Sequence, residues 1–512
     1  MDATVVLGIE PLGIDDVVSV AREGARVELA PEALEAIERS RAFVDELARS
    51  GRPVYGVSTG FGALATKFIA PELRHQLQRS LVRSHAAGSG ECVEREVVRA
   101  LMLLRLQTLT TGHTGVRAST ARAYADCINS QITPCVPEYG SLGCSGDLAP
   151  LAACALALMG EGVVFDANGD FKCAEEALAV AGLTPVELEE KEGLALVNGT
   201  DGMLGMLCLA IADLTSLVRA ADVAAAMSVE ALLGTDAAFA ADLQALRPHP
   251  GQAASARNMM RLLASSEIVA SHVDGDPRVQ DAYSLRCAPQ VAGAVRDTLA
   301  HARTVAEREL ASAIDNPVVL DDGRIVSNGN FHGAPVAYAL DFLAIAAADL
   351  ASISERRTDR MLDPARSHGL PPFLAENPGV DSGHMIAQYT QASIVSELKR
   401  LAAPASVDSI PSSAMQEDHV SMGWNAARKL RRSVDGLTRV IAIEALTASR
   451  ALDLRSPHKP APGTGAALAM IRERVAGIGP DRWLAPEIEA AHELVSGGAI
   501  VSAAEAVVGE LE

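Results

Sequence analysis

The chain has 512 residues, of which 49% are hydrophobic and 3% aromatic, so it is long enough for a large core and too apolar for a disordered protein. A core this poor in aromatic residues must be built from Ala, Leu, Val and Ile, and Ala with Leu favours closely packed helices. The net charge of −21 argues against nucleic-acid or anionic membrane partners, because both would be repelled.

The N-terminal sequence MDATVVLGIEPLGIDD has neither a basic stretch nor a long apolar run, so no signal peptide is expected. The most apolar stretch, MLGMLCLAIADLTSLV, contains Asp213 and continues into Arg219 and Asp222, which predicts a buried bundle helix rather than a membrane span. The eight cysteines show no Cys-x-x-Cys and no paired spacing, so neither a zinc site nor a disulfide framework is predicted. A reducing cytoplasm is the expected location.

The elements predicted along the chain form three segments of one integrated fold. Residues 1–200 mix helices with short strands: an amphipathic helix from Pro31 to Ser50 precedes RPVYGVSTGFG, a short strand running into a glycine loop. Residues 201–453 form a bundle, and 454–512 a small helical cap. The bundle's long helices are predicted over 202–233, 288–314, 334–361, 385–402 and 420–453. Their polar residues are too sparse for solvated helices, so the fold is predicted to be mainly α with helices packed side by side.

Residues 140–150, GSLGCSGDLAP, set three glycines around Cys144 and Ser145, which lets the backbone adopt conformations closed to other residues. A serine-hydrolase nucleophile elbow needs Gly-x-Ser-x-Gly, and this sequence has Asp147 at the final glycine position. That mismatch argues against a hydrolase. A plain glycine-rich turn between a strand and a helix remains the simplest alternative.

Two other site patterns are weak. Gly60, Gly62 and Ala65 match the Gly-x-Gly-x-x-Ala of a dinucleotide site, but QRSLVRSHAAG, about twenty residues later, lacks the acidic residue that binds the ribose. Glu489 and His492 form a Glu-x-x-His without the partner residues of a di-iron bundle. No metal site is predicted.

Polar and aromatic side chains gather on loops and helix ends between the apolar helices, where a bundle would place a site. A single such residue is usually a satisfied hydrogen-bonding group, whereas ten on five loops indicate a functional site. They are Tyr55, His85, Asn198, Gln280, Tyr283, Arg286, Phe331, His332, Glu417 and His419. The chain carries no pyridoxal-phosphate, zinc or nucleotide signature, so chemistry here would need an electrophile made by the protein itself.

The sequence GSLGCSGDLAPLA resembles the signature of the aromatic amino acid ammonia-lyases, in which an X-Ser-Gly tripeptide cyclises into 4-methylidene-imidazol-5-one (MIO). The resemblance implies that the Gly146 nitrogen attacks the Cys144 carbonyl and that loss of water from Ser145 leaves an electron-poor methylidene carbon, without an external cofactor. Essentially the whole chain resembles the family, through YGVSTGFG, RSHAAG, KEGLALVNGT, QDAYSLRC, NGNFHG and MQEDHVSMG. The resemblance is closest to histidine ammonia-lyases, particularly bacterial ones with Cys rather than the commoner Ala before the serine.

By this resemblance the protein removes ammonia from L-histidine to give trans-urocanate, the first step of histidine degradation. The implied catalytic residues are Tyr55 as the base, with Glu417 next in line, and Asn198, Gln280 and Tyr283 as groups that orient the ring formed from Cys144, Ser145 and Gly146. Arg286 would hold the substrate carboxylate as a bidentate donor, and Phe331 would shape the pocket.

The side-chain selectivity is implied by the pair Ser84-His85. Relatives acting on phenylalanine tend to have Phe-Leu there, and those acting on tyrosine His-Leu. His85 and Glu417 would give an imidazole polar partners that a phenyl ring leaves unsatisfied. Met385 is a further pocket candidate, beside His384 where the family pattern suggests Phe.

The resemblance also implies a homotetramer with each active site built from three chains. The long helices are apolar on many faces, and at ~1.5 Å per residue they would separate the candidate loops by about 30–45 Å within one chain. Several alternatives stay open: a phenylalanine or tyrosine ammonia-lyase, an MIO-dependent aminomutase, and a non-enzymatic protein on a lyase fold. PSSAMQED is also similar to a loop of the fumarase and aspartase superfamily, but lacks that loop's lysine.

Overall fold

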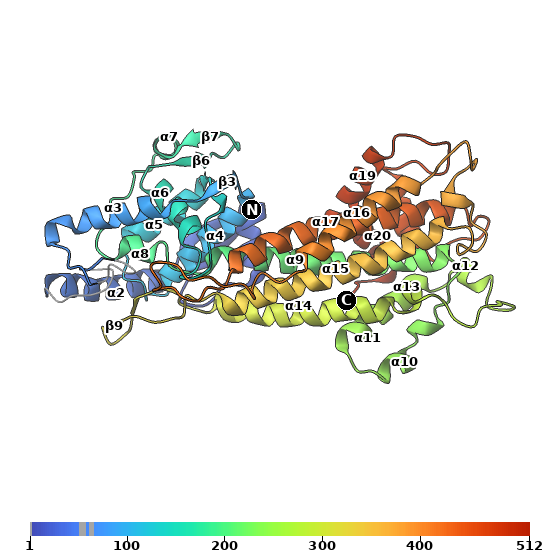
Figure 1. The fold of residues 1–512 in the computed structure, drawn as a ribbon, viewed down its shortest axis with the longest axis horizontal. Coiled ribbons are helices and arrows are strands. Elements are labelled where there is room, and N and C mark those ends of the chain that lie inside the picture. The colour runs from blue at the N-terminus through green and yellow to red at the C-terminus, as the bar shows by residue number, and fades with distance from the viewer. Residues whose placement is uncertain (1–2, 51–57, 61–65) are drawn as a thin grey trace. The chain divides into compact units, whose positions relative to one another are not determined.

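The computed structural model describes residues 3–50, 58–60 and 66–512 and is predominantly helical (Figure 1). This confirms the predicted mainly α fold with long helices. The chain divides into two compact units: unit 1 is Met1–Ala212, Arg303–Asp341 and Pro404–Arg428, and unit 2 is Asp213–Ala302, Phe342–Ala403 and Lys429–Glu512. The boundary falls inside four long helices: α9 (Asp201–Ala231), α14 (Ala288–Leu310), α15 (Ala334–Leu362) and α17 (Gly423–Asp453). The division at residues 200 and 453 stays a prediction.

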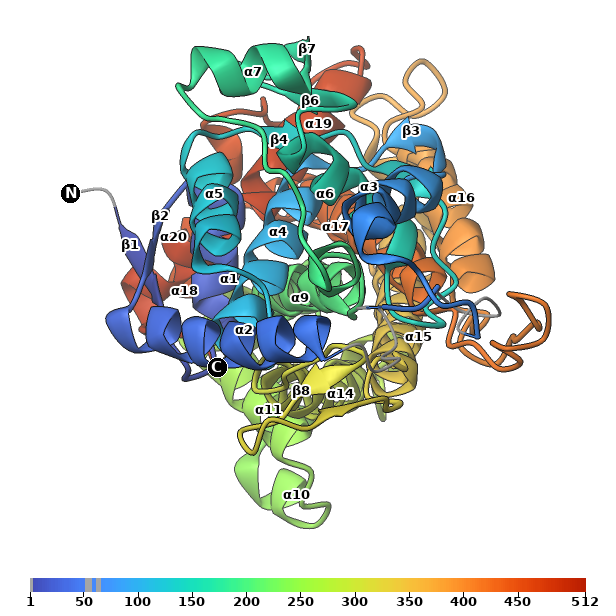
Figure 2. The ribbon, with the colours of Figure 1, turned by 90° about the vertical axis from the view of Figure 1, so that its left-hand side faces the viewer.

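Unit 1 holds the short helices of the N-terminal half and the strands that the structure describes. The elements are β1 (Thr4–Leu7), α1 (Ile14–Val18), the π-helix η1 (Ser19–Glu23), β2 (Arg26–Leu29), α2 (Pro31–Arg49), the 3-10 helix η3 (Pro71–Leu73), α3 (Arg74–His85), β3 (Ser89–Cys92), α4 (Arg95–Thr110), α5 (Ala118–Asn129), β4 (Thr133–Pro134), β5 (Pro137–Tyr139), α6 (Leu148–Leu158), β6 (Val163–Phe165), β7 (Phe171–Cys173), α7 (Ala174–Val180), α8 (Glu192–Ala195), β8 (Val318–Val319) and β9 (Ile325–Val326). The parallel pair β1·β2 has Thr4 opposite Arg26, and α5 packs against β2 (Figure 2). The other pairs, β3·β5, β4·β6·β7 and β8·β9, are antiparallel.

Helix α4 is the central helix of unit 1. Every residue from Val97 to Thr110 is buried, and α1, α2, α5 and α6 all pack against it. Two arginines, Arg99 and Arg105, lie within this buried stretch. A buried guanidinium must find hydrogen-bond acceptors, so α4 also fixes the backbone segments that supply them.

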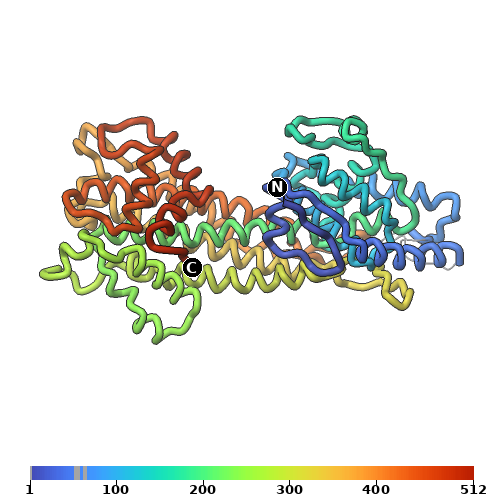
Figure 3. Tube along the Cα trace, turned by 180° about the vertical axis from the view of Figure 1, so that it is seen from behind, coloured from blue at the N-terminus to red at the C-terminus, as the bar shows by residue number. Residues whose placement is uncertain are grey.

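Unit 2 completes the long helices and adds shorter ones around them. Its further elements are η4 (Ala237–Phe239), α10 (Ala241–Ala245), α11 (Pro250–Leu263), α12 (Glu267–Ala270), α13 (Tyr283–Arg286), η5 (Pro372–Leu374), α16 (Met385–Leu401), α18 (Pro462–Arg472), α19 (Ala485–Ser496) and α20 (Ala499–Val508). The C-terminal helices α18 and α20 pack side by side, and α11 packs against both (Figure 3). Arg357 and Glu444 form a buried ion pair in this unit, and Ser228 and Ser354 donate to the same carboxylate.

The predicted long helices agree closely with the structure, and the differences at their ends have local causes. Helix α14 ends at Leu310 rather than at 314, where the Ser312 amide donates to the Glu309 carbonyl (3.0 Å), three residues back instead of four. Helix α17 begins at Gly423 rather than at 420, because Met422 has a left-handed backbone (φ 52°) that a right-handed helix cannot include. Most of RPVYGVSTGFG lies outside the described residues.

Two helices are long and apolar enough to cross a membrane by length and composition alone, α9 and α15. Within the fold, 72% of the apolar window of α9 and 67% of that of α15 are buried. This burial is what a core helix of a bundle requires.

One prediction about the cysteines is wrong. The structure joins Cys92 and Cys135 in a disulfide, with 5.4 Å between their Cα atoms. The two residues are 43 positions apart in the sequence, and the antiparallel pairing of β3 with β5 brings them together. Spacing rules missed the pair because the contact depends on strand pairing rather than on a local motif.

Candidate active site

The glycine-rich loop that connects β5 to α6 has a backbone that favours glycine at two positions. Gly143 (φ 67°) and Gly146 (φ 78°) lie in the left-handed region. Gly146 forms a parallel bridge with Gly199, and the Asp147 amide donates to the Gly199 carbonyl over 2.7 Å. A Cβ at residue 146 would overlap that carbonyl. The loop is therefore held flat against the segment that contains Gly199.

Asp147 ties this loop to the beginning of α9. Its carboxylate is fully buried and accepts hydrogen bonds from the Ser141 hydroxyl (2.8 Å) and the Met203 amide (2.9 Å). Burial raises the pKa of this carboxyl to about 7, although both hydrogen bonds act in the opposite direction. The Asp147 carboxylate therefore connects the start of the loop, at Ser141, to helix α9.

Cys144 and Ser145 face Glu417, which comes from the loop before α17. The Ser145 hydroxyl lies 3.5 Å from Glu417 Oε1, and Ser412 donates to Oε2 over 3.1 Å. Cys144 is 8% exposed, and burial, followed by Glu417, raises the pKa of its thiol to about 12. The thiol is therefore protonated at neutral pH, and both the thiol and the serine hydroxyl are directed at the carboxylate.

The loop over residues 404–422 packs directly on the tripeptide. Val420 and Met422 form a buried cluster with Cys144. The Ser421 hydroxyl also donates to the Gly143 carbonyl over 3.0 Å. These contacts fix Glu417 relative to Ser145, although the two are 272 residues apart in the sequence.

His85 is the last residue of α3 and lies near the same carboxylate. Its Nδ1 is 2.9 Å from the Leu81 carbonyl, which can only accept, so Nδ1 carries the proton and Nε2 is left as the acceptor of the neutral ring. Burial lowers the pKa of His85, whereas the nearby Glu417 raises it. His85 therefore offers a neutral ring nitrogen close to an acidic side chain.

Asn198 is buried one residue before Gly199 and is held at both ends. Its side-chain Nδ2 donates to the Asn316 carbonyl over 2.7 Å, and its own carbonyl accepts from Arg105 over 2.5 Å. Because Gly199 contacts the tripeptide loop, these bonds set the position of the Asn198 side chain relative to Ser145.

Phe331 and His332 lie on the loop before α15, where both are partly buried. The ring of His332 stacks on that of His419, with the centroids 5.5 Å apart and the planes 7° from parallel. Burial lowers the pKa of His332, and His419 lowers it further. The stack joins the Phe331 loop to the loop that carries Glu417.

Gln280, Tyr283, Arg286 and Met385 belong to unit 2. The Arg286 guanidinium lies 4.6 Å from the centre of the exposed Tyr283 ring, and its Nε donates to the Asp281 carbonyl over 3.1 Å. Gln280 is exposed, and Met385 begins α16 and is partly buried. Among the described residues, no hydrogen bond or ion pair engages the other guanidinium nitrogens of Arg286.

Three further residues singled out from the sequence have different outcomes. His384 is buried beside Met385 and bonds to the Thr447 hydroxyl over 3.2 Å, which marks it as a core residue. Tyr55, the predicted base, lies outside the described residues. Glu489 of the Glu-x-x-His pattern pairs with Arg439 over 2.8 Å, as on a solvated helix face.

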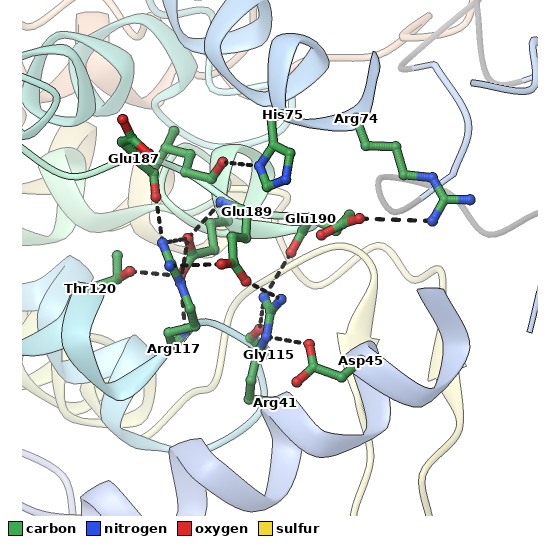
Figure 4. A network of polar contacts seen from close by, with 12 residues as sticks. Arg41, Asp45, Arg74, His75, Gly115, Arg117, Thr120, Glu187, Glu189 and Glu190 are labelled. Carbon is green, nitrogen blue, oxygen red and sulfur yellow. Dashed lines mark hydrogen bonds and ion pairs between the residues drawn. The ribbon is translucent and has the colours of Figure 1, made fainter. Parts of the chain in front are cut away.

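A polar network fixes the acidic segment over residues 187–192, which leads into Asn198 (Figure 4). Arg41 of α2 and Arg117 before α5 both contact the Glu189 carboxylate, each over 3.0 Å. Arg117 also pairs with the fully buried Glu192 over 2.7 Å. A buried carboxylate with this many charge-assisted donors resists displacement, so the segment has a defined position.

Helix α3 joins the same segment. His75 Nδ1 lies 3.2 Å from the Leu188 carbonyl (Figure 4), and the Gln78 side chain accepts from the Gly193 amide over 2.9 Å. Since α3 ends at His85, these contacts link the position of His85 to that of the segment preceding Asn198.

The chain matches the family model described as aromatic amino acid lyase over residues 12–473. It is 66% identical over 509 residues to histidine ammonia-lyase of Streptomyces avermitilis, covering 99% of each chain, and 52% identical to that of Symbiobacterium thermophilum, covering 98% of each. The solved histidine ammonia-lyase of Trypanosoma cruzi is similar at 38% identity and a TM-score of 0.91, covering 98% of this chain and 95% of that one. The solved tyrosine aminomutase of Streptomyces globisporus is similar at 37% identity and a TM-score of 0.92, covering 98% of each chain.

The chain belongs to the aromatic amino acid lyase family. In unit 1 of this lyase, the described structure brings together four of the predicted features: His85, the Cys144–Ser145–Gly146 tripeptide, Asn198 and Glu417. These come from segments far apart in the sequence, and the contacts described above connect each of them to the glycine-rich loop.

The tripeptide of this aromatic amino acid lyase fits the formation of MIO from its own residues. Gly146 has no space for a side chain, so its backbone can approach closely, and Gly143 supplies the left-handed turn before it. The Ser145 hydroxyl, which would leave as water, faces the Glu417 carboxylate.

Three charged residues beside the site were missed from the sequence. Arg105 is fully buried and bonds to the Asn198 segment, and Lys191 and Asp315 form a fully buried ion pair next to it. Lys191 has a left-handed backbone (φ 75°). A signal was present: Arg105 is a single cation within the apolar run LMLLRLQTL, and burial of such a residue requires specific partners.

Proposed function

We propose that the protein is a histidine ammonia-lyase, which eliminates ammonia from L-histidine to give trans-urocanate. The observation that carries this proposal is the meeting of His85 and Glu417 at the Cys144–Ser145–Gly146 tripeptide. Relatives of this name that are up to 66% identical over the full chain support it.

Selectivity for histidine follows from the polar groups beside the tripeptide. The free Nε2 of His85 accepts a hydrogen bond, and Glu417 accepts from a ring N–H, so both suit an imidazole. A phenyl or phenol ring would leave at least one of them buried without a partner, which costs binding free energy. Met385 is the proposed apolar contact to the substrate.

The proposed prosthetic group is MIO, formed autocatalytically from residues 144–146. When formed, it supplies an electron-poor carbon that turns the substrate amine into a better leaving group. Asn198, Gln280 and Tyr283 orient it and stabilise negative charge through hydrogen bonds, as an oxyanion hole does. The two anchors of Asn198 described above support this role.

The remaining roles belong to groups that handle the substrate. Arg286 binds the carboxylate in a bidentate manner, and Phe331 limits the volume of the pocket. Tyr55 removes the weakly acidic β-proton, for which a phenol needs a lowered pKa. Glu417 is the second candidate for this base.

The protein is proposed to act as a homotetramer in which three chains build each site. Arg286 precedes the first residue of α14 and Asn316 follows its last, and this helix of 23 residues is about 35 Å long. Apolar side chains on α15 and α16, such as Ile345, Ile386 and Tyr389, are exposed in the single chain. Burial of these side chains against a second copy would stabilise the assembly.

The proposed location is the cytoplasm, without nucleic-acid or membrane partners. The net charge of −21 supports this, because it favours solubility and repels polyanions.

A second candidate is an MIO-dependent aminomutase, which is favoured by the likeness to the tyrosine aminomutase structure. It would return ammonia to the β-carbon, so a β-amino acid would be among its products. Phenylalanine or tyrosine ammonia-lyase is the remaining alternative, and His85 argues against it.

The test incubates the purified protein separately with L-histidine, L-phenylalanine and L-tyrosine, without added metal or pyridoxal phosphate. We expect near-ultraviolet absorbance from urocanate with L-histidine and little product from the other two. Faster turnover of an aromatic amino acid, or a β-amino acid as the main product, would replace the proposed function with the corresponding alternative.

A further inference from the structure

Arg105 lies in the middle of α4 with its guanidinium fully buried. Its nitrogens donate to the carbonyls of Ala195 (3.1 Å), Asn198 (2.5 Å) and Ile314 (3.0 Å). It also pairs with the buried carboxylate of Asp201 over 3.2 Å. One side chain therefore holds both the segment that carries Asn198 and the segment that leads to Asn316.

The guanidinium also supports the backbone against which the tripeptide packs. A Cβ at Gly199 would overlap Asp201 Oδ2 and lie 2.6 Å from Arg105 Nη2, so the paired guanidinium and carboxylate fill the space behind this residue. On the other side, the Gly199 carbonyl meets Gly146 and accepts from the Asp147 amide. Gly199 therefore lies between the Arg105 guanidinium and the tripeptide.

A second set of contacts leads to the same asparagine. Ile314, held by Arg105, is followed by Asp315, which pairs with Lys191, and by Asn316, whose carbonyl accepts from the Asn198 side chain. Arg105 thus fixes the Asn198 backbone directly and its side-chain acceptor through two residues. Lysine cannot reproduce this, because a single ammonium cannot present the planar fork of donors.

We infer that Arg105 is a positioning residue for the reaction: it holds Asn198 and the Gly199 carbonyl in the geometry that ring closure at residues 144–146 and turnover both require. This inference rests on the proposed function. Arg105 does not touch the substrate, so its loss should reduce ring formation and kcat and leave KM nearly unchanged.

The test compares Arg105→Lys and Arg105→Gln with matched changes at Arg99, six residues earlier on the same helix. Arg99 is also buried and bonds only to backbone carbonyls, those of Val20 and Ile128, among the contacts described for it. Four quantities are measured on all four variants and on the unchanged protein. They are the intact mass, kcat and KM for L-histidine, and the melting temperature.

We expect both Arg105 variants to contain a large fraction of chains that have not lost the two waters of ring formation. Corrected for that fraction, kcat should fall by ~10²-fold, the cost typical of a misplacement of about 1 Å. The Arg99 and Arg105 variants should have melting temperatures lowered by a similar amount. The Arg99 variants, however, should show the normal loss of two waters and a normal kcat.

Normal ring formation and kcat in the Arg105 variants would overturn the inference. So would equal losses at Arg99, or insoluble Arg105 variants beside soluble Arg99 variants, because either would assign Arg105 to general folding. The unchanged protein separates the two proposals. Full water loss and turnover of L-histidine there support the function whatever the variants do, whereas their absence would overturn both.

Discussion

The backbone of Gly146 runs directly against the Gly199 carbonyl, with no space for a side chain between them. This contact joins the tripeptide loop to the Asn198 segment, and it explains why the motif ends in glycine for a second reason besides its positive φ of 78°. Even a methyl group at residue 146 would have to push the two segments apart.

We therefore predict that the unchanged protein loses two waters per chain relative to its sequence, one for ring closure and one for the Ser145 hydroxyl. Gly146→Ala should keep both waters, because the methyl group prevents the close approach. Intact-mass analysis measures this directly, with Ser145→Ala as a control that can lose one water at most. An unmodified mass in active protein would disprove ring formation.

The second prediction concerns His85→Leu. The neutral imidazole would be replaced by an apolar side chain of similar size, so L-histidine turnover should fall by at least ~10²-fold, since a buried polar substrate group loses its partner. Its melting temperature should change little, because His85 is a partly exposed residue at the end of α3. Steady-state rates with L-histidine, L-phenylalanine and L-tyrosine measure the change, and unchanged histidine turnover would remove His85 from the substrate site.

The third prediction concerns Tyr55→Phe, which removes only the phenolic hydroxyl. Turnover should fall by the ~10²–10⁴-fold typical of a lost general base, while the intact mass still shows the loss of two waters. The matched variant is Glu417→Gln. A larger loss there, with near-normal turnover in Tyr55→Phe, would move the base to Glu417.

The fourth prediction tests the sharing of sites between chains. Ser145→Ala and Arg286→Ala proteins should each be inactive, and co-expression should restore part of the activity in mixed tetramers. Different affinity tags on the two chains allow mixed tetramers to be isolated and assayed. If such tetramers are proven but inactive, or if the protein is a monomer, the shared site is wrong.

The fifth prediction follows from His384, whose pKa is lowered from 6.5 to about 3, mainly by burial. Between these values the unfolded chain binds a proton that the folded chain does not, so stability is full above pH 6.5 and falls as the pH falls towards 3. At pH 5 this costs about 2 kcal/mol per chain. His384→Gln keeps a partner for Thr447 without titrating, so its urea midpoint should fall less than that of the unchanged protein between pH 7.5 and 5. Equal decreases would show that His384 does not contribute.

The sequence predicted the long helices well because their apolar periodicity and proline boundaries are local signals, as at α15 and α16. The site residues were predicted from the resemblance to the ammonia-lyases, as for Cys144–Ser145–Gly146, and their roles stay predictions. The Cys92–Cys135 disulfide and the ion pair between Lys191 and Asp315 could not be predicted in this way, because each depends on which distant segments pack together. The burial of His384 was likewise not predicted, because the family pattern suggested only that Phe would be expected at this position.

Lys191 combines two requirements that no single replacement meets. Its left-handed backbone favours glycine or asparagine, whereas its pairing with the buried Asp315 requires a cation. A change to glycine would remove the backbone strain but leave the buried Asp315 carboxylate without its cation. A change to arginine would keep the charge, but it would keep the strained backbone and need a larger volume. Single substitutions of Lys191 should therefore not be tolerated, and a tolerated replacement would need a simultaneous change at residue 315. In a library of variants selected for activity, these two positions should vary together or not at all.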